Sequence, residues 1–306
     1  MISTKQVRFS LLIFLFSLST NLVAQPDLES LLDDSDDEDE LVTSTFKSTR
    51  LILAHTTRSI KENNLDVRIT HRFDDILGPA GGIHSFFGLD YVADVRIAFE
   101  YGVTDRIDIG FGRSKGASKV KENLDGFVKL HLLRQTLSNK MPVSLSVLLN
   151  SSVSIMQAST DSTSIAFFEK PAHRLSYVTQ VIVARKFSDR LSLMLLPTYV
   201  HRNFVEFDDE NGFIALGAGG RIKLTKRTAI VADYFYILSD LRQTNKNVYF
   251  NPLGIGFEIE TGGHVFHMNF SNSRGIIENQ YLPYTTSSWL SGEFRLGFNI
   301  SRMFAL

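Results

Sequence analysis

Cysteine is absent from the 306-residue chain. This absence excludes disulfide bonds, thiolate metal ligands and a catalytic thiol, and it excludes a lipoprotein, whose lipid is attached to a cysteine. Long apolar runs are also missing, because no segment after residue 24 approaches the roughly 20 consecutive apolar residues of a transmembrane helix. A disulfide-rich secreted domain and a helical membrane protein are therefore both excluded.

The first 24 residues have the composition of a secretory signal peptide. Lys5 and Arg8 precede an apolar core from Phe9 to Phe16, and the weaker stretch that follows ends at Ala24, where we expect cleavage. Nine acidic residues lie between Asp27 and Glu40. We expect residues 1–24 to be removed on export and residues 25–45 to form an acidic disordered segment.

The stretch from Asp94 to Arg113 has the pattern of a β-hairpin. Alternate residues are apolar on both sides of the sequence Gly-Val-Thr at 102–104. A period of two is typical of a strand with one apolar face and one polar face. With 102–104 as the turn, we expect Phe99 to lie opposite Ile107, and Glu100 opposite Arg106.

The same alternation returns along the chain and predicts twelve strands. We expect them near residues 64–73, 92–101, 105–113, 124–133, 142–155, 174–187, 190–201, 212–224, 227–238, 252–260, 264–272 and 290–303. Most are longer than the five or six residues usual in soluble proteins, and they suit a tilted strand that crosses a bilayer. The predicted fold class is all-β, an antiparallel transmembrane β-barrel over residues 64–306.

The connections between these strands alternate in length. Tight ones at 102–104, 188–189, 225–226 and 262–263 alternate with long ones at 74–91, 156–173, 239–251 and 273–289. Clipped periplasmic turns and long extracellular loops are typical of outer-membrane barrels. The alternative is a soluble periplasmic sandwich, which would have to bury its apolar faces against each other.

Residues 46–63 do not fit this count. Phe46 to His55 could form another strand, but a thirteenth strand would leave the N-terminus outside the cell. We therefore expect residues 46–63 to form a plug in the lumen or a periplasmic segment beneath the barrel. A barrel of 14 strands is the alternative.

Several strings resemble a known family. They include TFKSTR (45–50), EYGVTDRIDIGFGRS (100–114), ETGGHVFHMNFSNSRG (260–275) and FRLGFNISR (294–302). They are similar to an uncharacterised outer-membrane β-barrel family of Gram-negative bacteria, a domain of unknown function. The resemblance implies the fold and the bacterial outer membrane as location, and it implies no activity, cofactor or catalytic residue.

The alternation also predicts which charged side chains point into the lumen. The lumen-lining candidates are Arg68, Arg72, Asp94, Arg96, Glu100, Arg106, Asp108, Lys129, Arg221, Glu258, Glu260, His267, Glu293 and Arg295. These groups could pair across strands as a structural interior, or they could line a pathway that filters small polar or charged solutes. A pore or plugged transporter is thus the first functional hypothesis. A non-conducting barrel that acts as a scaffold or receptor through its extracellular loops is the second.

A lipid hydrolase is the third hypothesis, and the sequence gives it little support. Such enzymes place a His and a Ser side by side on a strand, but His267 and Ser271 are four residues apart, about 13 Å along a strand. We therefore predict no enzyme activity, no cofactor and no metal site. We also expect no nucleic-acid partner.

The last predicted strand carries apolar residues toward lipid and has Phe304 near the C-terminus. A terminal amphipathic strand that ends near an aromatic residue resembles the signal read by the barrel-assembly machinery. We accordingly expect that machinery and outer-membrane lipid as partners, together with a small polar solute.

Overall fold

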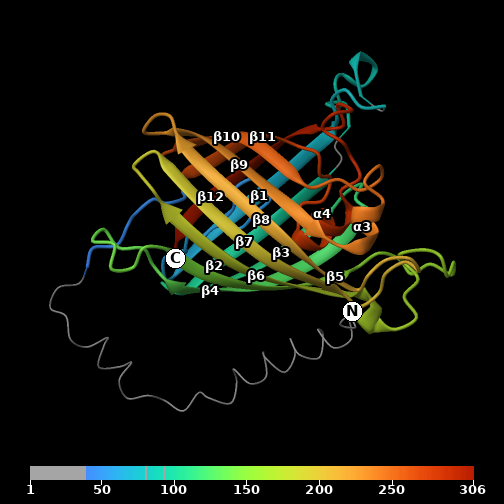
Figure 1. Cartoon of the computed structure of the whole chain (residues 1–306), viewed down its shortest axis with the longest axis horizontal. Coiled ribbons are helices and arrows are strands. Elements are labelled where there is room, and N and C mark those ends of the chain that lie inside the picture. The colour runs from blue at the N-terminus through green and yellow to red at the C-terminus, as the bar shows by residue number, and fades with distance from the viewer. Residues whose placement is uncertain (1–38, 80, 92–93) are drawn as a thin grey trace, which may run out of the picture. The chain divides into compact units, whose positions relative to one another are not determined.

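Twelve strands close into one antiparallel barrel, shown in Figure 1. The structure is a computed structural model that describes residues 39–79, 81–91 and 94–306. The predicted signal peptide and most of the acidic segment lie outside the described residues. Each strand pairs with its neighbours in the chain, and β1 closes the barrel by pairing with β12, where Ile69 lies opposite Ile300.

The strands match the predicted ones closely in position. Their bounds are β1 Asn64–Asp75, β2 Asp94–Thr104, β3 Ile107–Lys115, β4 Glu122–Leu133, β5 Ser144–Ser154, β6 Leu175–Lys186, β7 Leu191–Arg202, β8 Gly212–Lys223, β9 Thr228–Leu238, β10 Leu253–Thr261, β11 His264–Ser271 and β12 Arg295–Ala305. Short helices interrupt the loops: η1 Ile83–Ser85, η2 Pro171–Arg174, α3 Asp240–Thr244 and α4 Glu278–Tyr284. The predicted twelve-stranded barrel is confirmed, and the alternatives of a sandwich and of 14 strands are wrong.

The outer face of the barrel is apolar. Ile97, Phe99 and Phe111 of the predicted hairpin are all about half exposed, and Leu195 and Phe257 continue the same surface on distant strands. Because successive side chains alternate between the two faces of a strand, the polar residues of the same strands point inward. Among the described residues, no helix is both long and apolar enough to cross a membrane.

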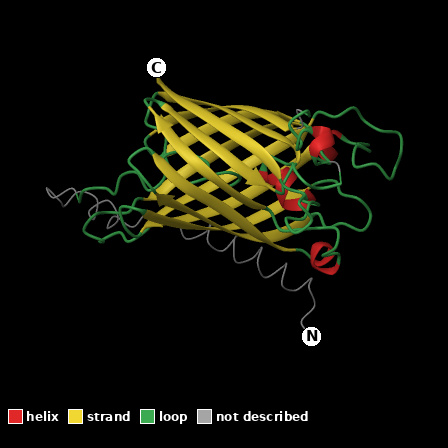
Figure 2. Ribbon diagram, turned by 90° about the horizontal axis from the view of Figure 1, so that it is seen from above, coloured by secondary structure: helices red, strands yellow, loops and turns green. Residues whose placement is uncertain are grey.

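The two ends of the barrel differ. Both views show the helices gathered at the end that carries the long loops (Figures 1 and 2), while the C-terminus lies at the opposite end. That opposite end carries the turns between β2 and β3, β6 and β7, β8 and β9, and β10 and β11. The first end is called the outer end below, and the other is called the inner end.

The predicted register of the β2–β3 hairpin is wrong. Phe99 pairs with Phe111, and Glu100 pairs with Gly110 instead of Arg106. Gly102 lies within β2, where it pairs with Asp108, and the turn follows at residues 105–106. A Cβ atom at Gly102 would lie 2.3 Å from the carbonyl oxygen of Lys61, so the small residue makes room for a neighbouring piece of backbone.

Candidate functional site

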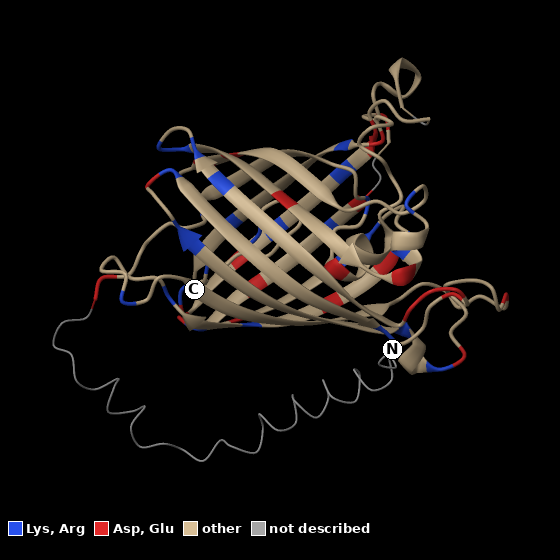
Figure 3. Ribbon diagram, viewed as in Figure 1, with Lys and Arg blue, Asp and Glu red and all other residues tan. Residues whose placement is uncertain are grey.

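The lumen has two unlike walls. Inward side chains of β6 to β9 form an apolar wall, which includes Val178, Ile182, Met194, Leu196, Phe213, Val231 and Phe235. Inward side chains of β1 to β4 and of β10 to β12 are mostly charged or polar and equally buried. Figure 3 shows that both basic and acidic residues occur along the strands of the barrel. The interior is therefore amphipathic across its width.

Most of the predicted lumen residues are buried inside the barrel, all in the charged wall except Arg221, which lies on β8. These are Arg68, Arg72, Asp94, Arg96, Glu100, Asp108, Lys129, Arg221, Glu258, His267 and Arg295. Three others lie elsewhere: Arg106 is exposed in the β2–β3 turn, Glu260 is half-buried near the inner end, and Glu293 lies in the loop before β12. Arg106 was misplaced because its position depended on the wrong hairpin register.

Ion pairs join many of the buried charges across strands. Arg96 of β2 holds Asp125 of β4 with two hydrogen bonds, from Nε at 3.0 Å and from Nη2 at 2.5 Å. Arg221 Nε lies 2.8 Å from Glu258, whose other oxygen is 3.2 Å from His267 Nε2. Buried charges persist in a protein only when they are paired and hydrogen-bonded. These pairs are formed entirely between side chains of the barrel strands.

A stretch of chain that precedes β1 runs through the lumen. Residues 46–60 contain Leu51, Leu53, Ala54 and Ile60, whose side chains have no exposed surface. We call residues 46–60 the inner segment. It forms no strand of the barrel, and its only described pairing is an isolated bridge between Arg50 and His55 that closes a tight turn.

One carboxylate of the barrel holds this turn. Asp233 Oδ2 accepts hydrogen bonds from the backbone N–H groups of Ile52, Leu53 and Ala54 at 3.0, 2.8 and 3.0 Å. The apolar side chains of the same turn pack on the apolar wall. Three converging backbone donors form an anion-binding nest, and here the anion is a side chain of β9.

The opposite side of the inner segment faces the charged wall. Thr49 Oγ1 donates to Glu100 at 2.6 Å, and Arg68 Nη2 donates to Thr49 Oγ1 at 2.7 Å. Nearer the inner end, Asp108 accepts from the backbone N–H of Ile60 at 3.1 Å. The inner segment thus matches both walls of the lumen, apolar on one side and polar on the other.

A second insertion enters the lumen from the outer end. The β11–β12 loop folds inward and carries α4, whose residues Glu278, Tyr281 and Leu282 are fully buried. Ser273 in this loop accepts a hydrogen bond through its carbonyl oxygen from Arg72 at 3.0 Å, and Arg295 donates to the Asn272 carbonyl at 2.6 Å. The charged wall therefore binds both insertions.

The two insertions meet at Arg50 and Glu278. Arg50 Nη1 lies 3.4 Å from Glu278 Oε1, and Arg50 Nη2 donates to His55 Nε2 at 2.5 Å. Because a guanidinium can only donate, His55 Nε2 is the acceptor of this bond. Arg50 is thus bound from both insertions.

Glycines in the wall make room for the inner segment. A Cβ atom at Gly254 would lie 2.7 Å from Ile52 Cγ2 and 2.8 Å from Asp233 Oδ1, and one at Gly219 would lie 3.1 Å from Leu51 Cδ1. Gly102 serves the same purpose beside Ile60, whose carbonyl oxygen would lie 2.7 Å from a Cβ atom there. A larger residue at Gly254 or Gly102 would press directly on the inner segment.

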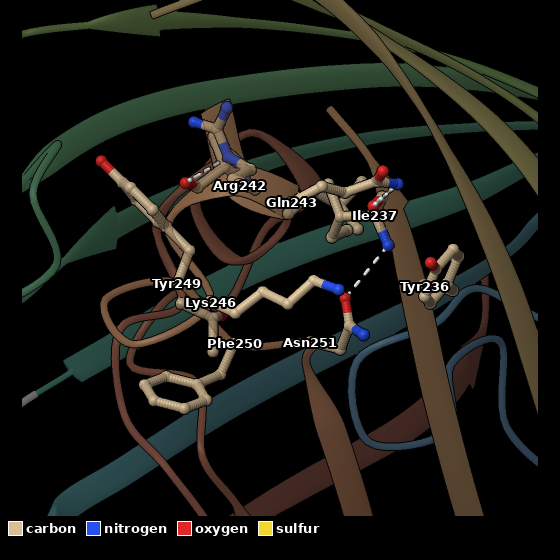
Figure 4. Close-up of a pocket in the computed structure, with 11 residues that line it drawn as sticks. Tyr236, Ile237, Arg242, Gln243, Lys246, Tyr249, Phe250 and Asn251 are labelled. Carbon is tan, nitrogen blue, oxygen red and sulfur yellow. Dashed lines mark hydrogen bonds between the residues drawn. The ribbon is translucent and has the colours of Figure 1, made fainter. Parts of the chain in front are cut away.

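A pocket of about 270 Å³ opens at the outer end beside α3, shown in Figure 4. Its lining includes Lys246, Tyr249 and Asn251 of the β9–β10 loop together with Leu282 and Pro283 from α4. The pocket therefore touches the insertion that holds Arg50.

The pocket is braced by an Arg-Asp-Arg clasp. Asp209 bonds both nitrogen atoms Nη1 and Nη2 of Arg202 at 2.9 and 3.0 Å and those of Arg242 at 2.8 and 2.9 Å. Burial opposes ionisation of Asp209, but the hydrogen bonds from Arg242 and Arg202 outweigh it and hold its pKa below the ordinary value. Asp209 therefore stays charged and ties the outer loops together.

His267 and Ser271, the residues considered for a lipid hydrolase, do not contact each other. His267 contacts Glu258, and Ser271 Oγ accepts from the Ser273 N–H at 3.0 Å. No group of metal-ligating side chains occurs in the described part of the chain.

Comparison with known proteins agrees with the barrel. The family model described as "Membrane bound beta barrel domain (DUF5777)" matches residues 46–304. The chain belongs to this family. The predicted resemblance to an uncharacterised barrel family is thereby confirmed, and the apolar outer face is the lipid-facing surface of a membrane-bound protein. The comparison with curated proteins gives no match.

Porins are among the similar solved structures. The NanC porin shares 9% identity over 79% of this chain and 100% of its own, with a TM-score of 0.46. The KdgM porin shares 8% over 79% and 99%, with a TM-score of 0.47. An anion-selective porin from Comamonas acidovorans shares 12% over 68% and 59%, with a TM-score of 0.33. These likenesses are too distant to identify a solute.

The sequence predictions placed Arg68, Glu100 and Asp108 in the lumen, but they included neither the apolar wall nor the contacts that the barrel makes with the inner segment. A signal for the wall is present, because the sequences of β6, β7 and β9 are apolar on both faces, as in strands buried on both sides. The run Leu51-Ile52-Leu53-Ala54 is a second signal. Asp233 carries no signal of its own, since nothing in its neighbourhood in the chain indicates that it binds residues 52–54.

Proposed function

We propose that the protein is a plugged transporter for small polar or charged solutes, closed at rest by the inner segment. The observation that carries this proposal is the fit of that segment to both walls of the lumen, with Leu51, Leu53 and Ile60 fully buried. Burying one such apolar side chain stabilises by about 1.5–3 kcal/mol. Opening therefore requires displacement of a well-packed element.

The solute class follows from the walls that displacement would uncover. A molecule in the vacated space would meet Arg68, Arg96 and Glu100 on one side and Val178, Leu196 and Phe235 on the other. Charged groups suit a polar solute, and an apolar surface suits its carbon skeleton. A small organic molecule with a polar edge and an apolar edge fits this interior.

The proposed location is the bacterial outer membrane, reached by export through a cleaved signal peptide. Lys5, Arg8 and the apolar stretch that follows them support export, and the asymmetry of short and long connections supports that membrane. The amphipathic β12 supports recognition by the barrel-assembly machinery. We propose no enzymatic activity for the chain.

Liposome swelling tests the transport proposal. We expect liposomes with the wild-type protein to exclude a small neutral sugar, an organic acid and an organic amine alike, and liposomes with Asp233→Ala to admit at least one of them. Neutralising Arg96 in the Asp233→Ala background should change the preference between the acid and the amine. Swelling that stays absent in a folded Asp233→Ala barrel would contradict transport through the lumen.

A non-conducting receptor is the second candidate, and the outer pocket favours it. The pocket is lined by Lys246, Tyr249 and Asn251, and it contacts α4. In this alternative the outer loops bind a ligand and the lumen stays closed. Variants that release the inner segment would then leave the liposomes impermeable.

A further inference from the structure

The β1–β2 loop carries an unusual number of exposed apolar side chains. Ile83, Phe86 and Tyr91 are 66%, 57% and 57% exposed, and Leu77 and Phe87 are also largely exposed. Across residues 76–79 and 81–91 the only carboxylate is Asp90, and no Lys or Arg is present. We call the exposed side chains of Leu77, Ile83, Phe86, Phe87, Leu89 and Tyr91 the apolar loop surface. Apolar groups gathered in this way mark an interaction site.

Backbone hydrogen bonds within the loop close it on itself. Phe86 and Phe87 both adopt left-handed backbone conformations, with φ of 47° and 54°, which is unfavourable for an aromatic residue. The Phe87 N–H donates to the Gly82 carbonyl at 2.7 Å, and the Gly82 N–H donates to the Ile76 carbonyl at 2.8 Å. The backbone is thus closed by its own hydrogen bonds, and the strained pair directs two aromatic rings outward.

The loop also has a distinctive position. Figure 1 shows this segment, in teal, standing out beyond the side of the barrel at its outer end. It leaves β1 and returns to β2, strands whose outward residues Ile69, Ile97 and Phe99 belong to the lipid-facing surface. A loop that leans sideways at this level lies over the membrane, and its apolar surface continues the apolar face of the barrel.

We propose that the apolar loop surface inserts into the surrounding membrane and anchors the outer rim of the barrel to lipid. The occupant is the headgroup and upper acyl region of the bilayer, because the loop lacks the basic residues that would select a charged partner. Aromatic and aliphatic side chains favour this region, where an apolar face sinks about 5–10 Å into the boundary between headgroups and acyl chains. This anchor is independent of any transport through the lumen.

Tryptophan fluorescence tests the proposal in the full chain. Trp289 is the single tryptophan and stacks on Phe294, so Trp289→Phe provides a silent background. In that background Phe86→Trp places a reporter on the apolar loop surface. Phe207→Trp is the matched control, because Phe207 is fully exposed on the β7–β8 loop at the same end. Leu89→Trp is a second reporter if the first does not fold.

The variants are reconstituted in phospholipid nanodiscs, with and without bromine atoms near the top of the acyl chains. We expect bromine to quench F86W by about twofold or more and to leave F207W unchanged, and we expect acrylamide to quench F207W more strongly, as shallow insertion requires. Equal acrylamide quenching of both variants, with no quenching by bromine, would overturn the proposal. If F86W were protected from acrylamide in native membranes but not in nanodiscs, the result would indicate a protein partner and would also overturn the proposal of a lipid anchor.

Discussion

Substitution of Asp233 by alanine should release the inner segment. The change removes one oxygen that accepts three backbone hydrogen bonds at 2.8–3.0 Å, from Ile52, Leu53 and Ala54. Hydrogen bonds to a charged group contribute about 1.5–3 kcal/mol each. The three bonds share one oxygen, and loss of the carboxylate also removes its desolvation cost. We therefore expect a net loss of about 3–4 kcal/mol for the docked segment.

That loss should raise the undocked population by about 100-fold to 1,000-fold, since every 1.4 kcal/mol is a factor of ten. The cysteine-free chain allows this to be measured with one introduced thiol. Ser48→Cys is nearly isosteric and lies at a buried position of the inner segment. Its rate of modification by a small thiol reagent reports the fraction of time for which the segment is undocked.

The control is Asp189→Ala, which removes the same charge from a fully exposed position in the β6–β7 turn. We expect it to leave the Ser48→Cys rate unchanged. Heat-modifiable migration on a gel confirms that each barrel is folded. An equal rate in Asp233→Ala and Asp189→Ala would refute the reasoning, because the carboxylate would then contribute nothing to docking.

Three further predictions concern the wall, the joint between the insertions and the outer clasp. Gly254→Ala should accelerate Ser48→Cys modification through its clash with Ile52, whereas Gly126→Ala, whose Cβ would meet only one atom at 3.6 Å, should not. Glu278→Gln leaves Arg50 buried without its carboxylate, and should lower the free energy of unfolding, measured by thermal unfolding, by about 3 kcal/mol. The control Glu206→Gln removes a carboxylate from an exposed pair with Lys119 and should have a far smaller effect. Because the pKa of Asp209 is lowered on folding, its contribution is complete above the ordinary Asp pKa of about 3.9 and is lost only as the pH falls below it. Hydrogen exchange of the β9–β10 loop should therefore show protection at pH 5 in the wild type, less at pH 3, and little at either pH in Asp209→Asn.

Most of the twelve strands could be predicted because their two faces meet different surroundings, lipid on one side and a polar interior on the other. Apolar residues such as Ile97 and Phe99 face outward, so the period of two is visible in the sequence itself. Strand positions and the number of strands follow from that period and from the alternation of short and long connections. Neither depends on what lies inside the barrel.

The contents of the lumen depend on contacts between distant parts of the chain. Gly102 resembles a turn glycine by sequence, and only the position of Lys61 explains why it lies within β2. Asp233 is one of many inward polar residues by its place in β9, and its role follows from the turn at residues 52–54. Residues 46–60 resemble a strand because Leu51 to Ala54 are apolar, yet their partners are side chains of the barrel wall.

Single-channel conductance most directly tests the claim that the inner segment closes the barrel. The protein is refolded once as the chain from residue 25 and once as a chain that begins at Asn63, and both are checked by heat-modifiable migration. We predict no current from the longer chain and a steady current from the shorter one. Silence from a folded shorter barrel, or equal currents from both, would contradict the account.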